Sequence, residues 1–76
     1  MELTKPLDAL NISKGQSVLV EFKTGVQYQG RLETFDIHLN LVIDDAQELV
    51  EGNVKRKLGR MLIRGDQVKF ILPFQK

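Results

Sequence analysis

The sequence has no cysteine and only one histidine in its 76 residues. The absence of cysteine excludes disulfide bonds and thiolate zinc sites, and one histidine cannot by itself build a histidine-rich metal cluster. We therefore expect neither a metal nor another cofactor. A domain this short buries only about 60% of its unfolded surface, so an efficient core or association with partner subunits must stabilise it.

Long apolar segments and a strong net charge are also missing. No stretch approaches the roughly 20 apolar residues that span a bilayer, and the amino-terminal residues lack the apolar core of a signal peptide. We expect a cytoplasmic protein without a membrane partner. The formal net charge is only +1, whereas an electrostatic, non-specific DNA binder is normally far more basic. An RNA ligand would therefore be selected by local geometry and base stacking.

A short helix is predicted ahead of the first strand. Pro6 suits the first helical position, after Thr4 or Lys5, and Gly15 should end the helix after about two turns. Helices this short are not stable alone in water. We expect this one to cover a barrel as a lid.

Beyond Gly15 the apolar residues follow a period of two, as in half-buried strands. Turns that contain glycine separate the apolar runs, and Pro73 ends the last one because proline cannot donate to a strand ladder. Five strands are predicted, over residues 18–23, 26–35, 39–46, 54–63 and 67–72.

Two features indicate that these strands bend. Gly30 lies inside the second run, where glycine usually marks a sharp bend or a close backbone approach. The apolar positions change from even to odd numbers between Thr34 and Asn40, so a turn or bulge must lie there. The pattern predicts an all-β fold, in which a short N-terminal helix precedes a strongly bent, five-stranded antiparallel barrel, as one domain over residues 1–76.

The last two predicted strands carry apolar residues on both faces. Residues 61–63 are Met-Leu-Ile, and Val68 and residues 70–72 are nearly as continuous. One small barrel cannot easily bury both faces, so we expect a neighbouring subunit to add its strand at this edge. The alternative is an ordinary core strand that is covered on both faces within the chain.

Two polar clusters interrupt the strand pattern at turns, where binding groups commonly lie. In the first, Asp36, His38 and Asn40 alternate with apolar residues, so we expect these three side chains to project together. The flat faces of histidine and of Arg64, in the second cluster, can stack on a nucleobase. The asparagine amide offers a donor and an acceptor that complement the pairing edge of uracil in single-stranded RNA.

The second cluster is Arg64-Gly65-Asp66. Its glycine could let the backbone come close to a ligand, and an aspartate could fix the orientation of the asparagine or the arginine. The residue types alone leave another interpretation open. A single histidine and a surface arginine can be incidental, and Asn40 can simply satisfy backbone groups of a turn.

A family resemblance supports the binding interpretation. Gly30 with residues 36–42 (DIHLNLV) resembles the first Sm motif, and residues 63–68 (IRGDQV) resemble the second. The spacing between them, the early helix and the final short strand are also similar, so the resemblance covers nearly the whole chain. The sequence is most similar to the minimal archaeal type of the Sm-like (Lsm) family, and less similar to the bacterial Hfq branch.

The resemblance implies rings of usually seven and sometimes six identical subunits, in which the fourth strand of one subunit pairs with the fifth of the next. It implies single-stranded, uridine-rich RNA on the inner rim of the ring, in RNA processing, turnover or ribonucleoprotein assembly, with other RNA-processing proteins as further partners. His38 and Arg64 would sandwich a uracil, Asn40 would read its edge, Asp66 would orient Asn40, and Asp36 would support the loop.

Other function classes fit less well. A scaffold ring that binds mainly proteins is the alternative, although it would not need His38, Asn40 and Arg64 together. We do not expect an enzyme, because the sequence has no glycine-rich phosphate loop or nucleophile elbow. The neighbouring Asp44 and Asp45 should also point to opposite faces of a strand. The basic residues 55–57 and Arg60 could form a solvated face, pair with other charges or contact RNA.

Overall fold

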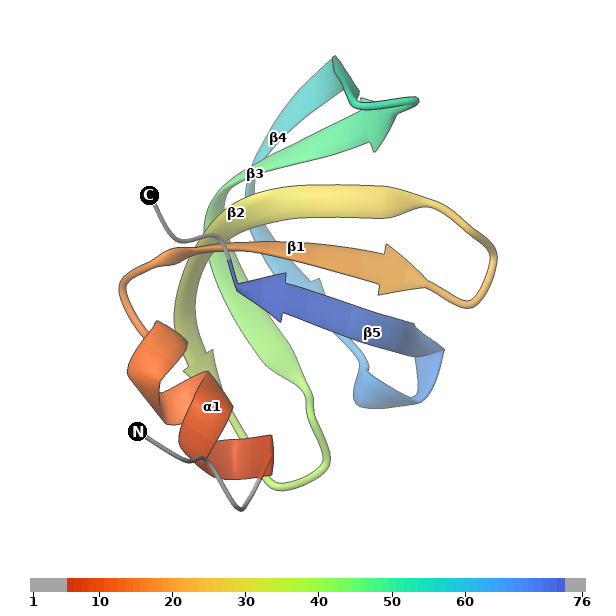
Figure 1. The fold of residues 1–76 in the computed structure, drawn as a ribbon. Helices are drawn as coiled ribbons and strands as arrows, with labels where there is room; N and C mark the ends of the chain where they lie inside the picture. Colours follow the sequence, from red (N-terminus) through yellow and green to blue (C-terminus); the bar gives the residue numbers. More distant parts are fainter. Residues whose placement is uncertain (1–5, 74–76) are drawn as a thin grey trace.

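The computed structural model describes residues 6–73 (Figure 1). It confirms the predicted fold class and four of the five strands to within one or two residues. The N-terminal boundary that we predicted from Thr4 and Lys5 lies outside the described residues. The elements are helix α1 (Pro6–Ser13), strands β1 (Ser17–Phe22), β2 (Gln27–Phe35), β3 (Leu41–Val50), β4 (Asn53–Ile63) and β5 (Val68–Pro73), and the 3-10 turn η1 (Gly65–Gln67) before β5.

The strands form one antiparallel sheet in the order β4-β3-β2-β1-β5. The sheet curls strongly, and β2, β3 and β4 change direction along their length (Figure 1). Within the described chain, β4 and β5 are not paired with each other and form the two edges of the sheet. The curled sheet is therefore open at the two strands that the sequence indicated as intersubunit edges.

The core fills the inside of this curl. Its buried apolar side chains come from α1 and from four of the strands, as the period-two pattern predicted. Helix α1 contributes Leu10, which is only 7% exposed, and the chain after the helix is tied to β2 by a hydrogen bond from the Gly15 N–H to the Leu32 carbonyl. The core residues are Leu10, Val18, Val20, Leu32, Leu41, Ile43, Ala46 and Ile63.

The sheet bends where Gly30 meets β3. A Cβ atom on Gly30 would lie 2.8 Å from the Asp44 carbonyl oxygen and 3.2 Å from the Ala46 Cα. The close backbone approach that we predicted at Gly30 is therefore confirmed. At this level β3 carries one residue more than either neighbouring strand, and Asp45 takes a left-handed φ of 53°.

The same bulge explains why the predicted third strand ended too early. Before the bulge the buried residues of β3 have odd numbers, as at Leu41 and Ile43, and after it they have even numbers, as at Ala46 and Glu48. The extra residue shifts the phase of the pattern. The strand therefore continues to Val50, although its alternation in the sequence breaks at residue 45.

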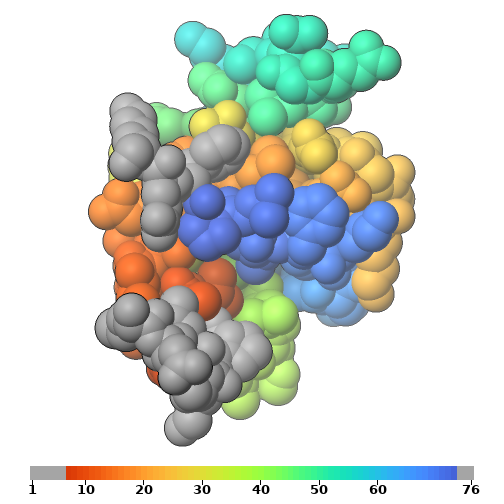
Figure 2. Space-filling model, in the orientation of Figure 1, coloured from red at the N-terminus to blue at the C-terminus, as the bar shows by residue number. Residues whose placement is uncertain are grey.

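Both edge strands expose large apolar side chains. Leu62 on β4 is 76% exposed, and Leu72 on β5 is 49% exposed, while the adjacent Ile63 lies in the core. The alternative of an ordinary strand covered on both faces is therefore wrong for a single chain. Figure 2 shows the β5 edge crossing one face of the molecule, between α1 and the projecting β3–β4 hairpin.

The packing at Gly30 gives a first prediction. Gly30→Ala should lower the free energy of unfolding by about 1–3 kcal/mol, because the added methyl group must displace the β3 backbone. Chemical denaturation at a fixed protein concentration measures this change. Unchanged stability would mean that β3 can move away from Gly30 without cost, contrary to the proposed constraint on the bend.

Candidate nucleic-acid interface

The antiparallel register of β3 and β4 brings the two polar clusters together. Leu41, the first residue of β3, lies opposite Ile63, the last residue of β4. The turn that precedes Leu41 and the turn that follows Ile63 must therefore lie side by side. Two segments more than 20 residues apart in the sequence become one surface for this reason alone.

The first cluster is a tight turn rather than an extended strand. The Leu39 N–H donates to the Asp36 carbonyl at 3.0 Å, and Leu39 takes a left-handed φ of 62°. The parity change that we predicted between Thr34 and Asn40 is thus confirmed as a turn. The expected alternation of side chains within it is wrong, because the backbone reverses there and leaves Ile37 exposed.

The Asp36 carboxylate organises this turn. Its Oδ1 accepts hydrogen bonds from the backbone N–H groups of His38 at 2.9 Å and Asn40 at 3.1 Å. Its Oδ2 accepts a third bond, at 3.0 Å, from the Asn40 side-chain amide. This amide contact is the main reason why the pKa of Asp36 lies below its ordinary value, and the backbone bonds add to it. Asp36 is therefore ionised at neutral pH and makes loop-supporting contacts of the kind that the resemblance implied.

The Asn40 side chain also holds the second cluster. Its Oδ1 accepts a 2.9 Å hydrogen bond from the Gly65 N–H. A Cβ atom on Gly65 would collide with the His38 carbonyl oxygen and lie 2.8 Å from the Leu39 carbonyl carbon. We expected Gly65 to allow a ligand to approach, whereas the structure shows that its missing side chain allows the two turns to approach each other.

Arg64 and Asp66 form a separate pair at the start of η1. The Arg64 Nη2 lies 3.5 Å from the Asp66 Oδ2, and the two side chains are 81% and 60% exposed. The resemblance implied that Asp66 orients Asn40. In the structure Asp36 and the Gly65 N–H orient Asn40, and Asp66 instead contacts Arg64.

Among residues 6–73, direct hydrogen bonds therefore join Asp36, Asn40 and Gly65, and an ion pair joins Arg64 and Asp66. His38 takes part through its backbone, and its side chain is exposed to solvent. No hydrogen bond or ion pair of the described chain links the side chains of His38 and Arg64. Both flat groups are exposed to solvent at the two turns that the Asn40 side chain joins.

The other basic side chains mostly pair with carboxylates on β3. Arg56 contacts Glu48 at 2.6 Å, and Arg60 contacts Asp44 at 2.7 Å. Of the three interpretations of this basic stretch, charge pairing therefore describes Arg56 and Arg60. Both arginines have a pKa above their ordinary value, because each donates hydrogen bonds to its carboxylate.

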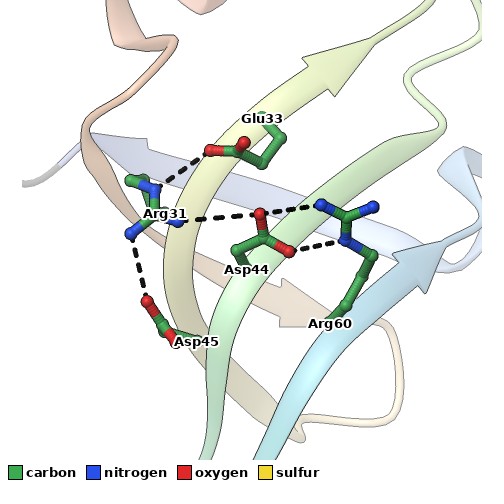
Figure 3. Close-up of polar contacts among 5 residues, drawn as sticks. All are labelled: Arg31, Glu33, Asp44, Asp45 and Arg60. Atoms are coloured by element: carbon green, nitrogen blue, oxygen red, sulfur yellow. Dashed lines mark hydrogen bonds and ion pairs between the residues drawn. The ribbon is translucent and has the colours of Figure 1, made fainter.

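Asp44 and Asp45 do not point to opposite faces, contrary to our expectation. The left-handed conformation of Asp45 turns its carboxylate to the same side, so that both carboxylates contact Arg31, at 3.6 and 3.0 Å (Figure 3). We did not predict this ion-pair network from the sequence. The two glycines that flank β3 at this level, Gly30 and Gly59, were the available signal of a shared bulge.

Across residues 6–73, no three histidine, aspartate or glutamate side chains gather in a way that could hold a metal ion. No helix within the same range combines the length and the apolar character that membrane crossing requires.

Comparison with known proteins agrees with the fold and the two motifs. Residues 8–73 match the family model of the LSM domain. An Sm-like protein from Archaeoglobus fulgidus is 48% identical over 69 residues, which are 91% of this chain and 90% of that protein.

Two solved structures are similar over nearly the entire chain. The Sm protein of Pyrococcus abyssii, solved in complex with a uridine heptamer, is 43% identical, with a TM-score of 0.88 over 92% of this chain and 99% of that chain. The P. aerophilum SmAP1 heptamer is 37% identical, with a TM-score of 0.89 over 99% of this chain and 100% of that chain. With its two motifs joined at one surface of a bent five-stranded sheet, the chain belongs to the LSM family of Sm-like proteins.

Proposed function

We propose that the chain binds single-stranded, uridine-rich RNA at the Asp36–Asn40 and Arg64–Asp66 turns, as one subunit of a homo-oligomeric ring. The observation that carries this proposal is the fixed orientation of the Asn40 amide. The similarity of the chain to an Sm protein that was solved with a uridine heptamer supports the same choice of ligand.

The Asn40 amide keeps one donor and one acceptor for a ligand. Its nitrogen has two N–H groups, of which one is used by Asp36, and its oxygen has two lone pairs, of which one is used by the Gly65 N–H. The remaining N–H and lone pair lie in the same amide plane. They complement a uracil edge, which presents a carbonyl oxygen next to the N3–H.

The polarity of this amide also provides a reason to reject cytosine. Cytosine presents an acceptor and an amino donor in the reverse order, so Asn40 would have to rotate its amide by half a turn to bind the same edge. After that rotation the amide oxygen would face the Asp36 carboxylate, and its NH2 group would face the Gly65 N–H. Both contacts are repulsive, because each places like partial charges together.

The flat side chains beside Asn40 would supply most of the affinity. A base that stacks on a flat side chain gains about 1–3 kcal/mol, whatever its identity. His38 and Arg64 are exposed at the two turns, and Asp66 limits the freedom of Arg64. Stacking would thus hold a base, and Asn40 would decide which base is preferred.

The two open edges of the sheet support a ring. An apolar hollow of about 290 Å³ lies beside β5, lined by α1, β5 and Leu39, and the exposed Leu62 on β4 offers an apolar side chain to such a hollow in a neighbour. Pairing of β4 with the β5 of the next subunit would satisfy the free backbone groups of both edges. We propose seven subunits, because the similar P. aerophilum protein is a heptamer.

We further propose that the protein is a binding module in RNA processing, turnover or ribonucleoprotein assembly and does not catalyse a reaction. The carboxylates at the site and at the bend support this view. Asp36 and Asp44 both have a lowered pKa, because hydrogen bonds stabilise their ionised forms. A general acid needs a carboxyl group that is protonated near neutral pH. The cytoplasmic location stays a prediction.

Replacement of Asn40 tests the base-reading role. Asn40→Ala should remove most of the preference for oligo-U over oligo-A, because a two-bond contact of this kind contributes about 1–3 kcal/mol of discrimination per base. Binding of fluorescent oligonucleotides measures the ratio of the two affinities. Asn53→Ala, on the distant β3–β4 hairpin, is the matched control and should keep the wild-type ratio. Equal affinity of the wild type for both oligonucleotides would contradict the role assigned to Asn40.

Replacement of Asp36 tests the orientation of the amide. Asp36→Asn should lower the ratio of oligo-U to oligo-C affinity, because a neutral neighbour no longer forbids rotation of the Asn40 amide. Asp66→Asn is the contrasting variant, since it alters only the contact with Arg64. It should weaken binding of both oligonucleotides and leave their ratio unchanged. If both variants change the ratio equally, the amide contact of Asp36 does not determine the choice of base.

Replacement of Leu62 tests the ring. Leu62→Asp should convert the ring into monomers or short open assemblies, because it places a charge in the apolar contact with the next subunit. Light scattering coupled to size-exclusion chromatography gives the mass. Val50→Asp introduces the same charge at an exposed apolar residue of the β3–β4 hairpin and should leave the ring intact. A wild type that is monomeric at micromolar concentration would contradict the ring, and a ring without RNA affinity would favour a protein scaffold.

A further inference from the structure

Three neighbouring strands bend along one line that crosses the sheet. On β2 the line passes through Gly30, on β3 through the bulge at Asp45, and on β4 through Gly59, which has a φ of 78°. The register shows one extra residue on β3 against each neighbour at this line, and compensating extra residues follow on β4 beside Gly59 and on β2 at Glu33. A bulge increases local bending and twist.

A network of charged side chains crosses the same line on the outer surface. Arg31 directly follows Gly30, Arg60 directly follows Gly59, and Asp44 lies between them on β3 (Figure 3). Arg60 forms a two-pronged contact with Asp44, at 2.7 and 3.1 Å, and Arg31 reaches the same carboxylate at 3.6 Å.

Arg31 also holds the bulge itself. It donates to Asp45 at 3.0 Å and to Glu33 at 3.0 Å. The planar arginine fork fixes direction as well as distance when it bonds two carboxylates. The carboxylate of Asp44 is only 16% exposed, so it is less screened by solvent than the surface pairs around it. The network therefore joins β2, β3 and β4 at the level of the bulge.

The angle of this bend determines how the β4 edge faces a neighbouring subunit. The part of β4 beyond Arg60 carries Leu62, and the β5 edge lies at the other end of the sheet. Neighbours in a closed ring are related by a rotation of about 51° for seven copies and about 60° for six, so a change of only about 9° exchanges one ring for the other. Small changes in the bend are thus sufficient to alter closure.

We propose that the Arg31–Asp44–Arg60 network, with Glu33 and Asp45, sets the bend of β2–β4 and thereby fixes the number of subunits in the ring. This inference rests on the proposed ring. Arg31 lies on β2, the central strand of the sheet, which is separated from both edge strands. Its members position the β4 edge, and the apolar contacts at that edge hold the subunits together.

Native mass spectrometry of the intact assembly, which counts subunits, tests this role. Arg31→Gln is the main variant, because Arg31 lies on the central strand, away from the two edges that would pair between subunits. Arg56→Gln is the matched control. It removes another ion pair between β4 and β3, with Glu48 at 2.6 Å, but lies away from the bulge.

We expect the wild type and Arg56→Gln to give one and the same subunit number. Arg31→Gln should shift to a mixture of ring sizes or open assemblies, while its far-ultraviolet circular dichroism stays that of the wild type. Arg60→Gln is a second variant with the same expected shift, and it carries the test if Arg31→Gln does not fold. Ammonium acetate at about 1 M, compared with about 0.1 M, should broaden the wild-type distribution in the same direction, because it screens the exposed members of the network.

Two failures can be told apart. If Arg31→Gln and Arg60→Gln both keep the single subunit number of the wild type, the network does not set closure, and this inference is overturned while the ring stands. If the wild type forms no ring, the proposed assembly is overturned, and the present inference falls with it.

Discussion

The contact between Gly30 and the backbone of β3 is the constraint on which the other features depend. The Asp44 carbonyl oxygen lies only 2.8 Å from the position that a Cβ atom on residue 30 would take. This closeness lets β2 and β3 bend together, and the extra residue of β3 passes the bend on to β4. Without the bend, the five strands would form a flat sheet whose inner apolar face remained in water. With it, Val18, Leu32 and Ile43 share a single core.

The same curvature gives the ends of the strands and the edges of the sheet different roles. At one end the register of Leu41 with Ile63 places the two turns of the site in contact. At the sides, β4 and β5 remain free to pair with other copies. A ring therefore repeats one small site at regular intervals. Because several sites can hold one RNA strand, each bound base raises the effective concentration of the next, and modest contacts at each site suffice for tight binding.

Much of this organisation could be predicted from the sequence, because it depends on local patterns. The helix, the strands, the bend at Gly30 and the turn before Leu41 all have signals within a few residues. The clusters around Asn40 and Gly65 could be located as turns, and the resemblance to the Sm motifs indicated that they act together.

The details that could not be predicted depend on where distant segments meet. The sequence offers both Asp36 and Asp66 as partners for Asn40, and only the structure shows that Asp36 holds the amide while Asp66 contacts Arg64. Likewise, Asp44 and Asp45 share one side only because a bulge gives Asp45 a left-handed backbone. A period-two pattern assumes a regular strand, so it fails at irregular positions such as this one.

The distribution of charge suggests how a chain with a net charge of only +1 can select RNA. Arg31, Arg56 and Arg60 are all engaged with carboxylates on or beside β3, so little of their charge is available to attract phosphate groups. Arg64 is 81% exposed, and it lies at the turn that touches Asn40. A protein that binds through a broad basic surface gains affinity for any nucleic acid, and its binding weakens steeply with salt. Here the exposed arginine lies at the turn that contacts Asn40, so the proposed base contact and a positive charge occur at the same place.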